Sequence, residues 1–88
     1  MNINEAIGLA RKKDPDLTPL MCMETKNWFK ISMGTKSGEA IGNGCTYAVD
    51  KKTGECGWKS MFADENFFND QLVRIYENKE IKQIIRNL

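Results

Sequence analysis

The chain has 88 residues and a net charge of +1, from 13 basic and 12 acidic side chains. This length suits one small domain with a single core, and we expect residues 1–88 to form one domain. The nearly neutral charge argues against nucleic-acid binding, which requires a basic surface that displaces counterions.

Histidine is absent from the sequence. Its absence removes the usual general base near neutral pH, the usual partner of a Ser or Cys nucleophile, and the commonest zinc ligand. We therefore predict that the protein is not an enzyme, and we assign it no catalytic residue and no cofactor.

The N-terminus lacks the basic start and the long apolar stretch of a signal peptide. No window approaches the roughly 20 apolar residues that a membrane span needs. The three cysteines, an odd number, suggest free thiols in a reducing compartment. These observations predict a cytoplasmic protein without a membrane partner.

The first predicted element is a helix that ends near Lys13. Asn2 and Glu5 have the spacing of a capping box, and Pro15 disfavours helical geometry at the residue before it. Between these limits, apolar residues recur at the spacing of one helix face. They are Ile3, Ala6, Ile7 and Ala10.

Two strands are predicted next, at residues 20–25 and 28–33, joined by a tight turn at Lys26–Asn27. In the second strand, alternate side chains point to opposite faces. Phe29, Ile31 and Met33 share the apolar face, and Trp28, Lys30 and Ser32 share a face that we expect to be solvated.

A glycine-rich connection at residues 34–44 leads to a predicted hairpin, with strands at 45–49 and 56–62 around a turn that contains Thr53–Gly54. Glycine accepts the positive φ that such a turn requires. If Asp50 pairs with Glu55, Cys45 and Cys56 lie roughly 13 Å apart along the strands. A disulfide needs Cα atoms within about 7 Å, so we predict none.

The C-terminal third, residues 63–88, is predicted to be helical. Its apolar residues fall on two opposed faces of one helical wheel, so either the helix breaks near Asn78, a candidate N-cap, or the last segment packs against a partner. A short terminal helix after such a break is also a candidate for a homodimer contact. Its residues are Ile81, Ile84, Ile85 and Leu88. The predicted fold is α+β: an N-terminal helix, an antiparallel sheet of three to four strands, and a C-terminal helix or helix pair.

Three kinds of site are not supported by the motifs. Gly44 leads into a β-branched and aromatic stretch, not into the helix that a phosphate loop requires. The three cysteines lack the tight spacing of a structural zinc site, so no metal ligand is assigned. Aromatic and basic residues on the predicted sheet suggest an RNA platform, but the neutral charge favours a role in the core.

Several short motifs together resemble the YrhB-like family of bacterial immunity proteins. They are a Trp-led strand at Trp28, a turn at Gly42–Asn43, an apolar strand ending in Val49–Asp50–Lys51, and the turn at Thr53–Gly54. The similarity covers roughly residues 3–72. It implies a small α+β protein that binds and neutralises a cognate toxin without catalysis of its own.

Under this resemblance, the partner-binding contact is expected at the end of the hairpin and on the adjoining face, where aromatic anchors have a charged rim. The predicted contact residues are Trp28, Asp50, Lys51, Lys52 and Glu55. The alternative is a phage or mobile-element inhibitor of a host defence system. Such an inhibitor acts by binding a protein or by sequestering a nucleotide signal.

Overall fold

The computed structural model describes residues 1–62 and 64–88, and within them the chain forms three helices and five strands. In chain order these are α1 (Ile3–Lys13), β1 (Thr18–Thr25), β2 (Trp28–Gly34), β3 (Cys45–Asp50), β4 (Cys56–Ser60), α2 (Glu65–Phe68), β5 (Leu72–Tyr76) and α3 (Asn78–Arg86). The predicted α+β class is confirmed, with more strands than the three to four expected.

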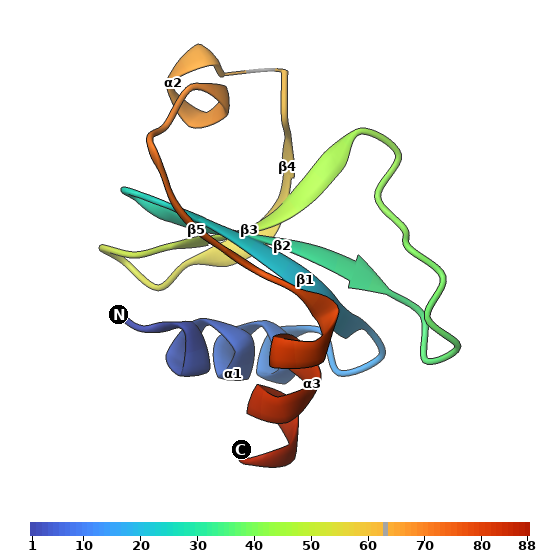
Figure 1. The fold of residues 1–88 in the computed structure, drawn as a ribbon. Helices are drawn as coiled ribbons and strands as arrows, with labels where there is room; N and C mark the ends of the chain where they lie inside the picture. The colour runs from blue at the N-terminus through green and yellow to red at the C-terminus, as the bar shows by residue number, and fades with distance from the viewer. Residues whose placement is uncertain (63) are drawn as a thin grey trace.

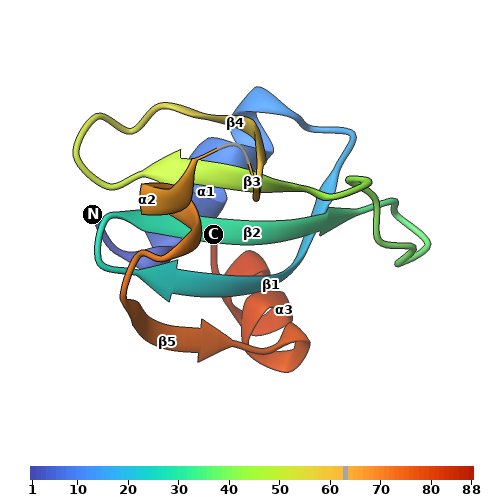
Figure 2. The same cartoon turned by 90° about the horizontal axis from the view of Figure 1, so that it is seen from above.

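The strands form one antiparallel sheet in the order β4-β3-β2-β1-β5, as Figure 2 shows. Helices α1 and α3 lie on one face of this sheet, and the short helix α2 lies on the other (Figure 1). We call the face under α1 and α3 the covered face, and the opposite one the open face.

Helix α1 forms as predicted. The side chain of Asn2 accepts a hydrogen bond from the Glu5 amide, the Glu5 carboxylate accepts one from the Asn2 amide, and the helix ends at Lys13. Its apolar stripe packs against the covered face, where α1 contacts β1 and β4. The buried stripe residues are Ala6, Ile7 and Ala10.

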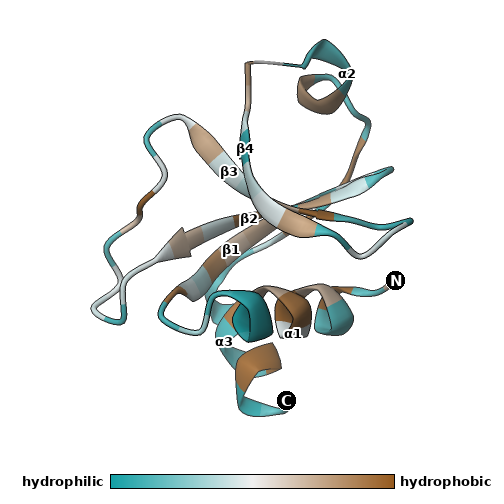
Figure 3. Cartoon of the chain, turned by 180° about the vertical axis from the view of Figure 1, so that it is seen from behind, coloured by the Kyte–Doolittle hydropathy of each residue, from teal (hydrophilic) through white to brown (hydrophobic). Residues whose placement is uncertain are grey.

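The core lies between the covered face and the two helices. Alternate residues of the central strands are buried in it, and apolar segments of the strands and helices meet there (Figure 3). Its fully buried strand residues are Cys22, Phe29, Ile31, Met33, Tyr47 and Val49. The predicted apolar face of residues 28–33 is thus confirmed as the core face.

The β3–β4 hairpin has the predicted register. Cys45 pairs with Ser60 and Val49 pairs with Cys56, and all three cysteines are free thiols. At the turn, the Asp50 carboxylate accepts hydrogen bonds from the amides of Lys52 and Thr53. Gly54 has φ of +79°, the positive value that was predicted there.

The helical prediction for the C-terminal third is wrong at Leu72–Tyr76, which form the edge strand β5. Valine, isoleucine and tyrosine favour strands, and pairing with β1 satisfies the backbone of this segment. The two opposed faces of the helical wheel therefore belong to two different elements, a strand and a helix.

The predicted break near Asn78 is confirmed, because α3 begins there. Its N-cap is Glu77, and the Asn78 side chain instead donates a hydrogen bond to the Leu20 carbonyl. Ile81 is fully buried in the chain's own core, and Ile84 and Ile85 pack against that core. Of the residues proposed for a dimer contact, Leu88 is the most exposed, and the contact itself stays a prediction.

Candidate protein-binding surface

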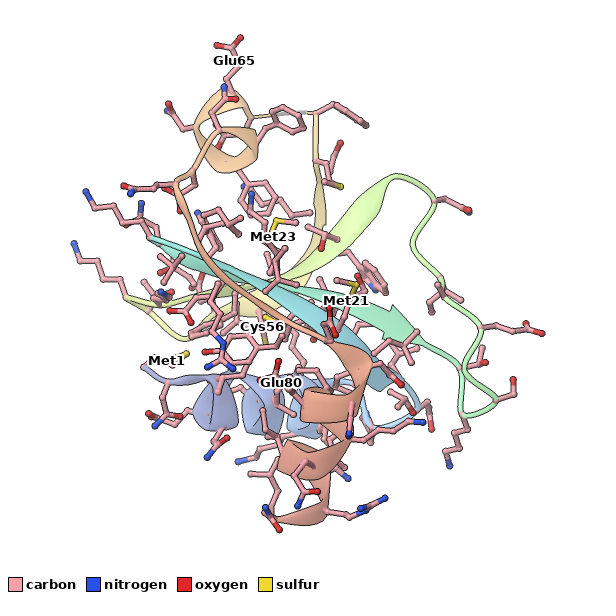
Figure 4. The ribbon with its side chains drawn as sticks, in the orientation of Figure 1. Met1, Met21, Met23, Cys56, Glu65 and Glu80 are labelled. Carbon is pink, nitrogen blue, oxygen red and sulfur yellow. The ribbon has the colours of Figure 1, made fainter. Side chains whose placement is uncertain are left out.

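The open face carries the side chains that alternate with the core residues. In β1 and β2, Met21 lies opposite Ser32 and Met23 opposite Lys30, and Ile75 of the edge strand β5 lies beside Met23. Figure 4 shows Met21 and Met23 on the side of the sheet on which α2 lies, away from Met1 and Glu80 on the helical side. Within residues 1–62 and 64–88, no long helix packs on this face.

Residues 64–71, which we call the strap, cross the open face between the two edge strands β4 and β5 (Figures 1 and 2). The strap contains α2, which begins with the Asp64 carboxylate accepting a hydrogen bond from the Asn66 amide. It lies over the end of the sheet near the β1–β2 turn (Figure 2). The other end of the open face remains uncovered.

Phe67 anchors the strap. Its ring is buried and meets the Trp28 ring edge-on, with 5.1 Å between the centroids. The Lys30 Nζ lies 4.2 Å from the centroid of the same ring, and the Lys59 Nζ lies 5.2 Å from it. Aromatic contacts and cation–π contacts of this kind each stabilise by about 0.5–2 kcal/mol.

Lys30 is the main departure from the expected solvated face. Only 7% of it is exposed, because Phe67 covers it, and its Nζ donates a hydrogen bond to the Phe67 carbonyl at 2.5 Å. Burial lowers the pKa of Lys30, and the nearby Asp70 carboxylate offsets part of that shift. No local pattern around Lys30 predicts this burial, because the residue that covers it lies 37 positions along the chain.

A second contact holds the end of the strap to the β1–β2 turn. The Asp70 carboxylate accepts hydrogen bonds from the amide and the side chain of Asn27, at 2.7 and 2.9 Å. Burial opposes the ionisation of Asp70, but hydrogen bonds from Thr25 and Asn27 outweigh it and lower the pKa of Asp70. The strap is therefore fixed at Phe67 and at Asp70.

Large exposed apolar side chains gather around the open face. Phe62 is 79% exposed and Phe68 is 50% exposed, and their ring centroids lie 5.9 Å apart above the sheet. Apart from Met1 and Leu88 at the ends of the chain, and Trp58, whose ring meets the core ring of Tyr47, the large apolar residues that are exposed in the described ranges lie on this face or along its border. They are Met21, Met23, Ile41, Phe62, Phe68, Leu72, Val73 and Ile75.

Both edges of the sheet are protected. At the β4 edge, Lys13 donates a hydrogen bond from its Nζ to the Cys56 carbonyl. At the β5 edge, the pairing with β1 is interrupted by a bulge after Glu24, and Arg74 forms an ion pair with Glu80. Bulges and charged side chains discourage the addition of a further strand.

The structure brings part of the predicted contact together at the end of the hairpin. Trp28 pairs with Asp50 across β2 and β3, and Lys52 and Glu55 are exposed beside them. Lys51 differs, because its Nζ forms an ion pair with Glu24 at 2.6 Å and only 20% of its side chain is exposed. Asp50 also has a local role, since it stabilises the turn.

Glu24 is the centre of a small network on the covered side of this end. Besides the Lys51 ion pair, it accepts a hydrogen bond from the Tyr76 hydroxyl at 3.0 Å. Burial opposes the ionisation of Glu24, but the bonds from Lys51 and Tyr76 outweigh it and lower the pKa of Glu24. This network joins β1, β5 and the β3–β4 turn, so Lys51 contributes to the fold.

Sequence reasoning missed the apolar residues of the open face as a surface. The alternation of Met21 and Met23 with Cys22 was a usable signal. The missing information was which face the helices cover, and that depends on contacts between distant parts of the chain.

Within the described ranges, no group of three or more Cys, Asp or Glu side chains is placed to hold a metal ion. None of the helices described is long and apolar enough to cross a membrane. No family model matches the sequence, and no curated protein or solved structure matches it either.

Proposed function

We propose that the protein binds another protein through the open face, and that it is of the immunity type, neutralising a cognate bacterial toxin in the cytoplasm by direct contact. The observation that carries this proposal is the gathering of exposed apolar side chains on one face of the sheet. Isolated exposed apolar residues are ordinary, but a contiguous group marks an interaction surface.

The composition of the surface supports a protein partner. Aromatic residues and methionine are enriched in interfaces, and the open face has the Phe62–Phe68 pair on one side and Met21 and Met23 at its centre. Trp28 contacts the strap at Phe67, and the exposed charges of the hairpin tip, Lys52 and Glu55, suit a polar rim. The motif resemblance to immunity proteins supports the choice of a toxin as partner.

The test is an affinity recovery from the native host with three baits: the natural chain, the Phe62→Ser/Phe68→Ser variant and the Leu88→Ser variant. We expect the natural chain and Leu88→Ser to recover the same partner, and the double variant to lose it. Leu88 is a matched control because it is an exposed apolar residue, at 57%, on the helical side.

The identity of the recovered partner decides between the two function classes. A toxin domain supports the immunity type, whereas a host-defence protein supports the phage or mobile-element inhibitor. Equal recovery by all three baits contradicts the open face as the binding surface. Circular dichroism of each bait confirms that a loss of binding is not a loss of folding.

A further inference from the structure

The uncovered end of the open face contains a pocket of about 230 Å³. It lies between β1 and β2 on one side and the start of β3 on the other, and the glycine-rich connection closes it. Pockets for drug-sized ligands measure about 300–1,000 Å³, so this one suits a smaller molecule. Its main lining side chains are Met21, Met23, Lys30, Ile41, Thr46 and Met61.

The lining is apolar and sulfur-rich, with one charged side chain, Lys30. Methionine side chains are flexible and polarizable, so they adapt to apolar bodies of different shapes. An apolar wall with one fixed charge is a common pattern for small-molecule sites, because the wall provides affinity and the charge fixes the orientation.

Lys30 lies where the pocket meets the strap, and its charge is only partly balanced. An ammonium group has three N–H donors, and within the described ranges the Phe67 carbonyl is the one acceptor within hydrogen-bond distance of the Nζ. None of the ion pairs in those ranges includes Lys30. The nearby Asp70 carboxylate offsets part of the effect of burial on the pKa of Lys30, so the Lys30 charge is partly balanced. A buried charge that is only partly balanced is costly, so a bound anion would stabilise this site.

We propose that the pocket binds a small free monocarboxylate with an aliphatic or aromatic body. The body lies among Met21, Met23 and Met61, and the carboxylate accepts hydrogen bonds from the free donors of Lys30. A phosphate, with two charges, suits one cation in an apolar wall less well. A metal cation is disfavoured by the ammonium group.

The test uses the whole chain with ¹³C-labelled methionine methyl groups and the probe 4-phenylbutyrate, with the neutral 4-phenylbutanamide as its control. We expect saturable shifts of the Met21, Met23 and Met61 methyl signals with the acid, and little change at the buried Met33 of the covered face. We expect the amide to bind at least about tenfold more weakly than the acid, because the charge-assisted hydrogen bond is lost. No saturable shift with the acid, or equal affinity for acid and amide, overturns the proposal.

Two further measurements complete the test. The Lys30→Gln variant is expected to bind acid and amide alike, and a retained preference for the acid overturns the role of Lys30. If the variant fails to fold, the affinities of the natural chain for the acid and the amide still test whether the pocket recognises the carboxylate. Shifts of the same methyl groups that depend on protein concentration without probe would show a second copy as occupant and overturn the proposal. Binding of a free acid does not depend on the proposed protein partner, so either proposal can fail alone.

Discussion

The two faces of the sheet are built from the same strands but have different partners. On the covered face, Phe29, Ile31 and Tyr47 pack against α1 and α3 and are fully buried. On the open face, Met21 and Met23 remain more than a third exposed, and the strap buries one large ring there, Phe67. One face therefore holds the fold together, while the other leaves apolar area exposed to solvent.

The largest expected effect compares one residue type on the two faces. Phe29 and Phe67 are both buried, at 0% and 1% exposure. We expect Phe29→Ala to lower the free energy of unfolding by about 3–5 kcal/mol. Phe67→Ala should lower the free energy of unfolding by about half as much, because the strap can detach and the Lys30 ammonium group is then hydrated again. Urea denaturation measures both changes.

Hydrogen exchange locates the two losses. For Phe67→Ala, we expect faster exchange in residues 64–71, with the amides of β2 and β3 still protected, because local opening is cheaper than global unfolding. Equal costs of the two substitutions, with global loss of protection in both, would show that the strap is part of the core.

The Glu24 network gives a smaller effect that depends on pH. The pKa of Glu24 is lowered in the folded state, so its stabilisation is fully present above the ordinary carboxyl pKa of about 4.3 and is lost as the pH falls through the lower, folded value. We expect Glu24→Gln to cost about 1–3 kcal/mol at pH 7, and this difference to shrink below pH 4.3 or so.

Denaturation at several pH values measures the effect of Glu24→Gln. The matched control is Glu55→Gln, at an exposed position of the hairpin tip, which should change the free energy of unfolding by less than about 0.5 kcal/mol. A cost of Glu24→Gln that does not change with pH would contradict the assigned role of the Glu24 carboxylate.

Substitutions on the open face should have the smallest effect on stability. We expect Met21→Ser and Met23→Ser each to change the free energy of unfolding by less than about 1 kcal/mol, because both side chains keep much of their contact with water. Met33→Ser, on the covered face of the next strand, should cost several times more. Thermal unfolding of the three variants measures these changes. Similar losses of unfolding free energy in all three would contradict the difference between the two faces.

Thiol reactivity distinguishes the faces without a substitution. Burial, with Glu24 nearby, raises the pKa of Cys22 to about 12, whereas Cys45 is exposed at the rim of the pocket. Because the thiolate is the reactive form, we expect a thiol reagent at pH 8 to modify Cys45 rapidly and Cys22 only after unfolding. Mass spectrometry of partly labelled protein shows the order in which the cysteines are modified. Early labelling of Cys22 would contradict its place in the core.

Local signals predicted much of the fold. The capping box and the apolar stripe defined α1, and the turn at Thr53–Gly54 fixed the register of the β3–β4 hairpin. Strand β5 was missed because its apolar residues also fit a helical wheel, and its conformation is decided by pairing with β1, about 50 residues earlier. Long-range pairing of this kind leaves no mark on the local pattern.

The candidate site was predicted only in part. Trp28 and the charged turn could be proposed from the sequence because they lie in or beside recognisable strands and turns, and their role in a contact stays a prediction. The burial of Lys30 and the apolar border around Met21 and Phe68 depend on the path of the strap across the sheet. Residues far apart in the sequence meet there, so their joint surface exists only in the folded chain.

The most direct measurement of the central claim is a methionine-methyl NMR spectrum of the protein with its recovered partner. The five methionines sample both faces. Met21, Met23 and Met61 line the open-face pocket, and Met33 lies in the core. Met1, just before α1, lies near Gly54 of the β3–β4 turn. We predict that partner binding shifts Met21 and Met23 and leaves the buried Met33 unchanged. Shifts at Met1 with Met21 and Met23 unchanged would contradict the claim that the open face binds the partner.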